Sequence, residues 1–303
     1  QGYSSAASDV YKRQILYSNL IKWGEINLKR IKKGDIVGRI SYGKDILFVV
    51  DRIIKTTDKN EFAILKGLTV RIKADSPIDD LEIVEKRIVQ ENIKLFENKI
   101  EDRLRKCLYC IDTDKRSKRT FNSGRILHLD GDRKYSEKSL RYYKSLGLDA
   151  VVKNIPESRQ PKFVRILLEK YKPDILVITG HDGMIKKGTK YNDIYNYRNS
   201  IYFINSVIEA RRWNSMGRDL VIFAGACQSY YEAIMDAGAN FASSPGRILI
   251  DFMDPLIVAE KVALTDESKY ITISDIENEL RDGIKGVNGI GAMGKKKVIV
   301  TKM

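Results

Sequence analysis

The sequence DILVITGHDG, residues 174–183, decides the fold of this chain. Its apolar run, Ile175 to Ile178, is followed by a turn of small and polar residues. A second stretch, LVIFAGACQ at residues 220–228, repeats this arrangement. Strands of parallel sheets are buried on both faces, and they therefore consist of continuous apolar runs of this kind. The two stretches predict neighbouring parallel strands of an α/β domain.

Each of the two turns carries one side chain that is able to do chemistry. His181 is one of 2 histidines and Cys227 is one of 3 cysteines in the chain of 303 residues. Functional groups of open α/β sheets gather at the carboxyl ends of the strands, so we expect His181 and Cys227 to share an open groove at one rim of the sheet. Because a thiolate beside an imidazole is the nucleophile of a cysteine peptidase, the pair predicts that chemistry.

The local sequence around Cys227 leaves two interpretations open. A cysteine beside a strand is commonly a small buried apolar residue with no chemical role. However, a helix is expected to begin near Ser229 or Tyr230, and its N-terminal N–H groups would favour the thiolate. The backbone N–H groups of Gly183 and Cys227 are then the expected donors to the oxyanion of the reaction.

The composition is that of a basic chain with enough apolar residues for a core. Hydrophobic residues make up 43% of the sequence and the net charge is +14, which favours acidic partners. The basic residues are dispersed and no nucleic-acid-binding motif accompanies them, so we do not expect nucleic acid as a partner. No apolar run approaches the length of a membrane span, and no membrane partner is expected. The odd number of cysteines favours a reducing compartment over a disulfide framework.

Neither a metal nor another cofactor is expected. Cys107 and Cys110 form at most half of a zinc site, because no second CxxC motif or histidine pair completes it. The glycine-rich segment 283–294 lacks the strand and the helix that flank a phosphate-binding loop. His128 lies inside an apolar run and is expected to be a core or edge histidine rather than a residue of the cleft.

The first part of the chain predicts a small accessory domain. Residues 1–14 resemble translated sequencing-adapter sequence and are excluded from fold reasoning. Closely spaced short apolar runs with glycine turns predict an SH3-like β-barrel over residues 15–76, whose last strand is expected at 69–72. Residues 77–124 are expected to form a long amphipathic helix, from 78 to 106, and then a basic linker.

The second part predicts the catalytic domain. Strands and helices alternate over residues 125–282, which is typical of a three-layer α/β sandwich around a mostly parallel sheet. The expected elements include a helix at 199–213 and a late strand at 248–250. Residues 283–303 are rich in Gly and Lys and are expected to form a loosely ordered tail.

The motifs resemble two groups of peptidases. In caspase-like cysteine peptidases, one apolar strand ends in His-Gly and another in a small residue and Cys; here Asp182 stands between His181 and Gly183. A closer resemblance is to the YabG family, the sporulation-specific peptidases of spore-forming Firmicutes, and it spans roughly Lys22 to Gly291. It rests on six motifs, at residues 34–39, 127–132, 177–182, 196–200, 223–229 and 238–245.

The resemblance implies a cysteine peptidase in the cytoplasm of the mother cell that acts on spore coat and coat-morphogenetic proteins and associates with the forming coat. It also implies cleavage after Arg or Lys, which an acidic residue near the cleft, Asp251 among them, would select. The basic linker Lys115–Arg119 would suit self-cleavage under that preference, although a solvated charge run explains it equally well. The expected substrate contacts are Asp182, Asp193, Gln228, Ser243 and Ser244.

Two other functions stay open from the residues alone. The barrel and the basic surface would suit a non-enzymatic scaffold that binds coat proteins or nucleic acid. The same Cys–His pair would also serve an amidohydrolase or an acyltransferase. Thiol-directed inhibition separates the enzymes from the scaffold, and protein against small-amide substrates separates the two kinds of enzyme. The oligomeric state does not follow from the sequence.

Overall fold

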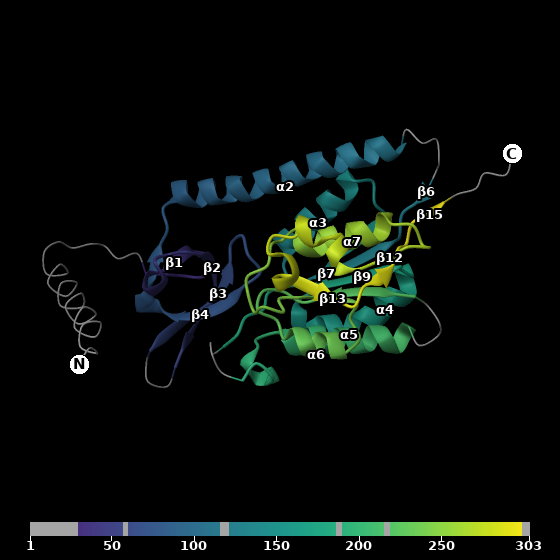
Figure 1. The fold of residues 1–303 in the computed structure, drawn as a ribbon. Coiled ribbons are helices and arrows are strands. Elements are labelled where there is room, and N and C mark those ends of the chain that lie inside the picture. The colour runs from purple at the N-terminus through teal and green to yellow at the C-terminus, as the bar shows by residue number, and fades with distance from the viewer. Residues whose placement is uncertain (1–29, 57–59, 116–120, 186–189, 215–218, 299–303) are drawn as a thin grey trace, which may run out of the picture. The chain divides into compact units, whose positions relative to one another are not determined.

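The structure is a computed structural model that describes residues 30–298 except 57–59, 116–120, 186–189 and 215–218. It does not describe the side chains of residues 107–121, which include Cys107 and Cys110. The expected adapter-derived segment lies outside the described residues, and so does a large part of the basic linker. Contacts divide the chain into Gln1–Lys32 and Lys33–Met303. The elements below belong to the second unit (Figure 1).

The N-terminal part is a five-stranded antiparallel sheet with the strand order β4-β3-β2-β1-β5. Its strands show the alternation of buried and more exposed residues that a sheet with one covered face requires, as in β3, where Ala63 and Leu65 are fully buried. The strands are β1 (Ile36–Arg39), β2 (Leu47–Lys55), β3 (Glu61–Gly67), β4 (Lys73–Pro77) and β5 (Leu81–Ile83).

The expected strand at 69–72 is not part of this sheet. Residues Leu68–Ile72, which we call the Arg71 loop, lie between β3 and β4 and leave the ladder. The loop is closed at its base by a hydrogen bond from Gly67 N to Ile72 O of 2.8 Å. Ile72 instead forms an isolated bridge with Asp182, so the loop reaches the second domain.

The long helix α2 (Lys86–Lys115) begins eight residues later than the hydrophobic pattern indicates. Residues 78–83 instead form a 3-10 turn, η2 (Ile78–Asp80), and β5, which pairs with β1 and completes the N-terminal sheet. That sheet therefore extends beyond the expected boundary at residue 76. The pairing of β5 with β1 thus takes residues that the helical pattern had assigned to the helix.

The second part is a six-stranded sheet with the order β13-β11-β10-β9-β7-β8. All neighbouring strands are parallel except the edge strand β13, which is antiparallel to β11. The mostly parallel α/β domain is therefore confirmed. Its strands are β7 (Ile126–Asp130), β8 (Ala150–Asn154), β9 (Ile175–Thr179), β10 (Val221–Ala224), β11 (Phe241–Ser243) and β13 (Val287–Gly289).

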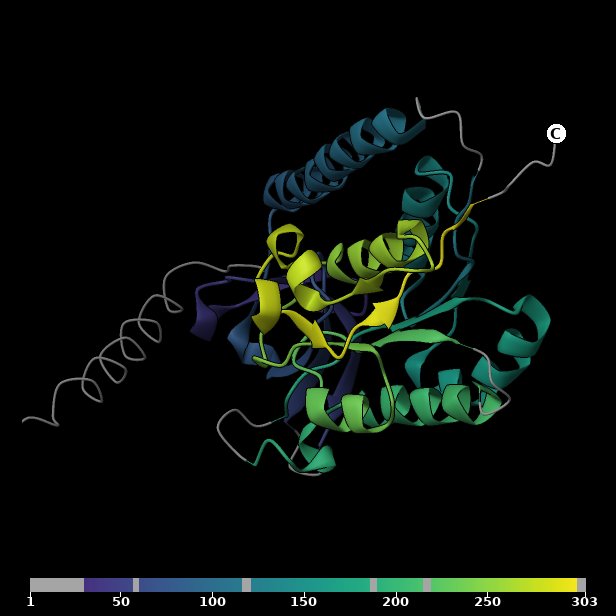
Figure 2. The ribbon, with the colours of Figure 1, turned by 45° about the vertical axis from the view of Figure 1, so that its right-hand side comes forward.

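Helices pack on both faces of this sheet (Figures 1 and 2). Side chains of β9 alternate between two cores: Ile175 and Val177 face one, and Leu176 and Ile178 face the other. This alternation is why the strand sequence is continuously apolar. The helices are α3 (Arg133–Ser145) and α7 (Asp254–Leu264) on the first face, and α4 (Gln160–Tyr171), α5 (Ser200–Asn214) and α6 (Tyr231–Asp236) on the second.

The C-terminal third differs from the expectation in two respects. Residues 248–250 are not a strand, and the buried helix α7 follows them. Residues 283–298 are not a loose tail, because β13 extends the main sheet, and β14 (Ala292–Met293) and β15 (Lys297–Val298) pair with β12 (Tyr270–Ile271) and β6 (Phe121–Asn122).

Candidate active site at the carboxyl rim of the sheet

His181 and Cys227 follow adjacent strands at the same rim. β9 and β10 are parallel neighbours, with Val177 opposite Phe223 and Ile178 opposite Ala224. Cys227 lies three residues beyond the end of β10 and His181 two residues beyond the end of β9. The expectation that both emerge at one rim is confirmed.

The expected open groove is not present in this structure. His181 is 1% exposed and Cys227 is 0% exposed. The Arg71 loop of the N-terminal sheet runs across the rim here: Asp182 N donates to Arg71 O at 3.3 Å, and Lys73 N donates to Asp182 O at 2.8 Å. The reactive side chains are therefore covered by a segment of the same chain.

The thiol of Cys227 lies against backbone. Ile250 N donates to its Sγ at 3.4 Å, and Sγ lies 3.8 Å from Ile250 O. Burial raises the pKa of Cys227 to about 12, against smaller opposite effects of hydrogen bonds from the backbone of Ile250 and of Arg71. The helix expected beside it, α6, starts only at Tyr231 and has 6 residues. The thiol is consequently protonated in this state, contrary to the expectation from the sequence.

His181 is held in place through its backbone and not through its imidazole ring. Its N–H donates to Glu157 Oε1 at 2.7 Å, and its carbonyl accepts a bond from the Asn199 side chain at 2.6 Å. Neither ring nitrogen has a hydrogen-bond partner among the described residues. Burial lowers the pKa of His181, while Asp132 and Glu157 raise it. A neutral ring results, free to accept or donate a proton.

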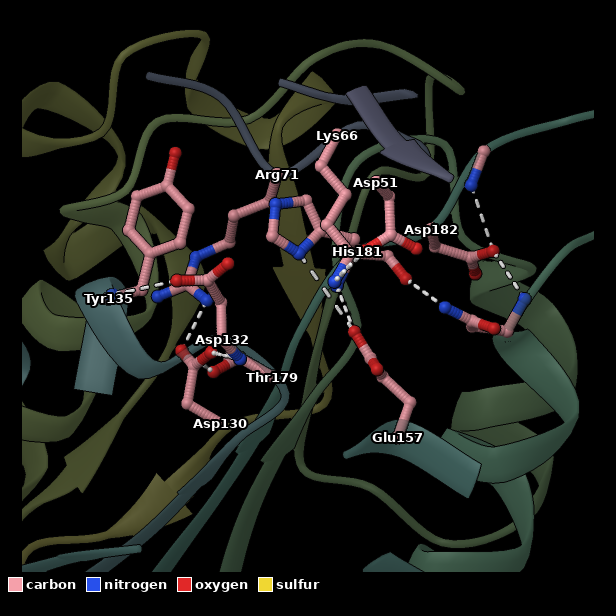
Figure 3. A network of polar contacts seen from close by, with 12 residues as sticks. Asp51, Lys66, Arg71, Asp130, Asp132, Tyr135, Glu157, Thr179, His181 and Asp182 are labelled. Carbon is pink, nitrogen blue, oxygen red and sulfur yellow. Dashed lines mark hydrogen bonds and ion pairs between the residues drawn. The ribbon is translucent and has the colours of Figure 1, made fainter. Parts of the chain in front are cut away.

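A buried ion pair fills the space beside His181 (Figure 3). The guanidinium group of Arg71 pairs with Asp130, and both side chains are 0% exposed. The carbon of that group lies 4.7 Å from the ring centre of Tyr135 and 5.3 Å from that of Phe252. Tyr135 also adjoins His181, with ring centres 5.7 Å apart. Arg71 thus enters a pocket with a carboxylate and two aromatic walls.

Asp130 is fixed from behind by a chain of buried side chains. Thr179 Oγ1 donates its proton to Asp130 Oδ2 at 2.8 Å, so in its 2.7 Å contact with His128 Nε2 it must accept, and His128 Nε2 donates. The other ring nitrogen then accepts from Tyr143 OH at 3.1 Å. Burial lowers the pKa of His128 to about 3. His128 is a core residue, as expected.

The carboxylate of Asp182 organises the rim. It is fully buried and accepts hydrogen bonds from Gly183 N, Asn199 N and the hydroxyls of Ser200 and Ser229. Burial raises its pKa to about 6, partly offset by these neutral donors. The carboxylate ties the turn after β9 to the start of α5 and to the turn after β10, which corrects the expected contact with substrate.

Gly183 has a role other than the expected one. Its N–H donates to Asp182 Oδ1 at 2.8 Å and so is not available to an oxyanion. A Cβ at this position would lie 2.3 Å from Lys73 O. Glycine is therefore required for the close approach of the residues that follow the Arg71 loop. In contrast, the N–H of Asp182, which directly follows His181, donates to the carbonyl of Arg71.

The remaining expected contacts lie at different places. Gln228, with φ of 56°, accepts from Met184 N and lines a cavity of 360 Å³ together with Ile72, Lys73 and Arg198. Ser244 accepts from Gln228 N at 3.0 Å and supports that turn. Ser243 is buried, Asp193 caps a 3-10 turn at Tyr195, and Asp251 accepts from Met253 N beside α7.

Three residues of the site did not stand out in the sequence: Arg71, Asp130 and Tyr135. Asp130 ends β7, the neighbour of β9, and that position was its signal. Arg71 follows a strand of the N-terminal sheet and lies 59 residues before its partner, so no local pattern relates them.

The described residues contain no group of three or more His, Cys, Asp or Glu side chains that could hold a metal ion. Among the helices of that same part of the chain, none has the length and apolar character needed to cross a membrane.

Comparison with known proteins gives one consistent result. The family described as YabG peptidase U57 matches residues 32–301. The sporulation-specific protease YabG of Bacillus subtilis (strain 168) is 36% identical over 284 residues, which cover 88% of this chain and 96% of that protein. No solved structure matches.

Proposed function

This chain belongs to the YabG peptidase U57 family, whose Bacillus subtilis relative is a sporulation-specific protease, and on that premise we propose that it is a cysteine endopeptidase with Cys227 as nucleophile and His181 as general base and acid. The observation that carries the proposal is the parallel pairing of β9 with β10, which brings the two side chains to one rim. Membership of a peptidase family favours this function over the scaffold and over the amidohydrolase or acyltransferase.

In the proposed reaction, His181 takes the proton of the Cys227 thiol. The thiolate attacks the carbonyl carbon of the scissile bond, a C–S bond forms, and His181 gives the proton to the leaving amine as the C–N bond breaks. Water then attacks the thioester, His181 takes one of its protons, and the C–S bond breaks to release the acid and the thiolate. The unpartnered ring nitrogens of His181 suit both transfers.

The oxyanion would be held by backbone N–H groups at the two strand ends. The N–H of Asp182 supports this assignment because it already donates to a carbonyl, that of Arg71. The N–H of Cys227 is the second proposed donor, as in the sequence-based prediction. Fixed donors of this kind stabilise the charge that develops on the carbonyl oxygen.

We further propose the substrate class and the place of action from the family. The substrates would be spore coat and coat-morphogenetic proteins, cut after basic residues, in the cytoplasm of the mother cell where the coat assembles. Gln228 and the cavity that it lines would receive the chain beyond the scissile bond. We also propose that the N-terminal sheet is an SH3-like barrel and that the main sheet is that of a caspase-like peptidase.

The test is cleavage of a spore coat protein extract and of arginyl peptide amides by purified variants. Cys227→Ala should leave the melting temperature unchanged and reduce cleavage to the level of buffer. The matched control is the double variant Cys107→Ala/Cys110→Ala, which should keep full activity and full inhibition by iodoacetamide. Cleavage by Cys227→Ala above the level of buffer would refute the assignment.

A further inference from the structure

The Arg71 loop is placed as a substrate would be. The carbonyl of Arg71 accepts from the N–H that follows His181, and the backbone beyond it continues along Asp182 and Gly183 through the bond from Lys73 N. Main-chain hydrogen bonds of this kind are how proteases and other peptide-binding proteins hold an extended segment. Glycine at position 183 makes room for that segment.

The side chain of Arg71 supports the same interpretation. It enters the pocket of Asp130, Tyr135 and Phe252 with its positive charge fully buried, and its Nε and Nη2 have no partner among the described residues. A planar guanidinium is suited to such a place, because it pairs with a carboxylate and stacks on aromatic faces, whereas an ammonium group does so less well.

The carboxylate of Asp130 is also held by neutral donors. Asp132 N donates to Oδ1 at 2.8 Å and Thr179 Oγ1 to Oδ2 at 2.8 Å, and His128 fixes Thr179 in turn. Without a guanidinium this buried carboxylate would have only neutral donors, and an unpaired buried charge is strongly unfavourable. Removal of Arg71 from the pocket therefore calls for another cation in its place.

Two cavities lie on either side of the Arg71 loop. One of 360 Å³ is lined by Ile72, at its end, and by Gln228. The other, of 290 Å³, is lined by Leu68, at its start, and by Tyr135. The two ends of the loop thus each line a cavity.

We propose that Asp130, with Tyr135 and Phe252, forms the pocket that recognises the arginine before the scissile bond, and that Arg71 of the chain itself occupies this pocket and keeps the enzyme latent until the Arg71 loop withdraws. The inference rests on the proposed cysteine peptidase function and deepens it. A substrate arginine would replace Arg71 on Asp130, and withdrawal of the loop would expose Cys227 and His181 together.

The experiment compares Arg71→Ala with the parent protein and with Arg52→Ala, which removes an exposed arginine from β2 of the same sheet. The first readout is the rate at which iodoacetamide modifies Cys227, measured by mass spectrometry of its peptide with the Cys107/Cys110 peptide as internal reference. We expect a rate at least tenfold higher in Arg71→Ala and no change in Arg52→Ala. Should Arg71→Ala not fold, Arg71→Met keeps the apolar contacts with the aromatic rings and serves instead.

The second readout is binding of methylguanidinium, measured as a rise in melting temperature. Arg71→Ala should be stabilised by millimolar methylguanidinium, whereas the parent, Arg52→Ala and the double variant Arg71→Ala/Asp130→Asn should not. Methylammonium at equal concentration should stabilise less. The third readout is cleavage of arginyl against lysyl peptide amides, where Arg71→Ala should gain on the arginyl substrate at least fivefold.

The outcomes separate this inference from the proposed function. Faster alkylation and methylguanidinium binding without any peptide cleavage would support the pocket and refute the peptidase. Arginyl cleavage by the parent protein, with alkylation and binding in Arg71→Ala equal to those in Arg52→Ala, would support the peptidase and overturn the pocket. An Arg71→Ala protein that is less stable and no more reactive would show that the ion pair is only structural, and it would likewise overturn the inference.

Discussion

The ends of β7 and β9 are alike in composition and opposite in environment. Each has a buried histidine and a buried aspartate: His128 lies within β7 and Asp130 at its end, and His181 and Asp182 follow β9. Both ring nitrogens of His128 are hydrogen-bonded, and neither nitrogen of His181 has a partner among the described residues. Burial alone thus does not distinguish the two histidines, and their hydrogen-bond partners do.

The two aspartates show the same contrast in charge. Asp130 has a cation beside it, and Arg71 lowers its pKa although burial raises it. Asp182 has only neutral donors, and burial raises its pKa to about 6. The end of β7 is therefore built to hold a positive charge, and the end of β9 is built to shape the backbone around the reacting groups.

The largest effects are expected when each of the two histidines is replaced by alanine in turn. His181→Ala should lower kcat/KM by at least about a thousandfold, since general acid–base catalysis and activation of the thiol are both lost, with a free energy of unfolding within about 1 kcal/mol of the parent. His128→Ala should lose about 2–4 kcal/mol of stability, because it leaves a cavity and removes the hydrogen-bond partner of the Tyr143 hydroxyl, and should keep activity while folded. Peptidase assays and urea unfolding measure both; a reversed pattern would contradict the assignment.

Removal of the charge of Asp130 tests the buried pair. Asp130→Asn leaves the Arg71 guanidinium buried beside neutral groups and should cost about 3 kcal/mol of unfolding free energy. The double variant Arg71→Met/Asp130→Asn should recover a large part of that loss, since the uncompensated charge is gone. Equal losses in the single and double variants, measured by chemical denaturation, would argue against the coupling.

The raised pKa of Asp182 predicts a particular pH dependence. Its folded value of about 6 lies above the unfolded value near 4, so the unfolded state gains more from ionisation as the pH rises. This group should therefore lower stability by roughly 2–3 kcal/mol between about pH 4 and pH 6. Asp182→Asn removes that contribution, and the difference in unfolding free energy between parent and variant should shift by this amount across the window. A constant difference from pH 4 to pH 7 would count against it.

The smallest effect is expected at Glu157, whose charge acts on His181 from 3.9 Å and raises its pKa. Glu157→Gln keeps an acceptor for the backbone N–H of His181 and removes the charge. We expect less than a tenfold change in kcat and a downward shift of the acidic limb of the pH–rate profile, because the pKa of His181 falls. An upward shift would disagree with the electrostatics of the site.

Much of the fold was predictable from local patterns. The apolar runs at Ile175–Ile178 and Leu220–Ala224 encode strands buried on both faces, and the strands formed as predicted. Helix α7 escaped prediction because nearly all of its residues are buried, so it has no polar face to give a helical period. The segment 69–72 has the residues of a strand, and its contact with the turn after β9 overrides that propensity.

The sequence by itself determined the two buried strands β9 and β10, and that His181 and Cys227 lie at one rim, because the ends of apolar runs are properties of neighbouring residues. Only the tertiary structure decided what faces those side chains. Arg71 meets Asp130 across 59 residues of chain, and the loop that carries it excludes water from the thiol. Desolvation and charge pairing depend on distances in space, and these set the protonation of Cys227 and the preference of the pocket for a cation.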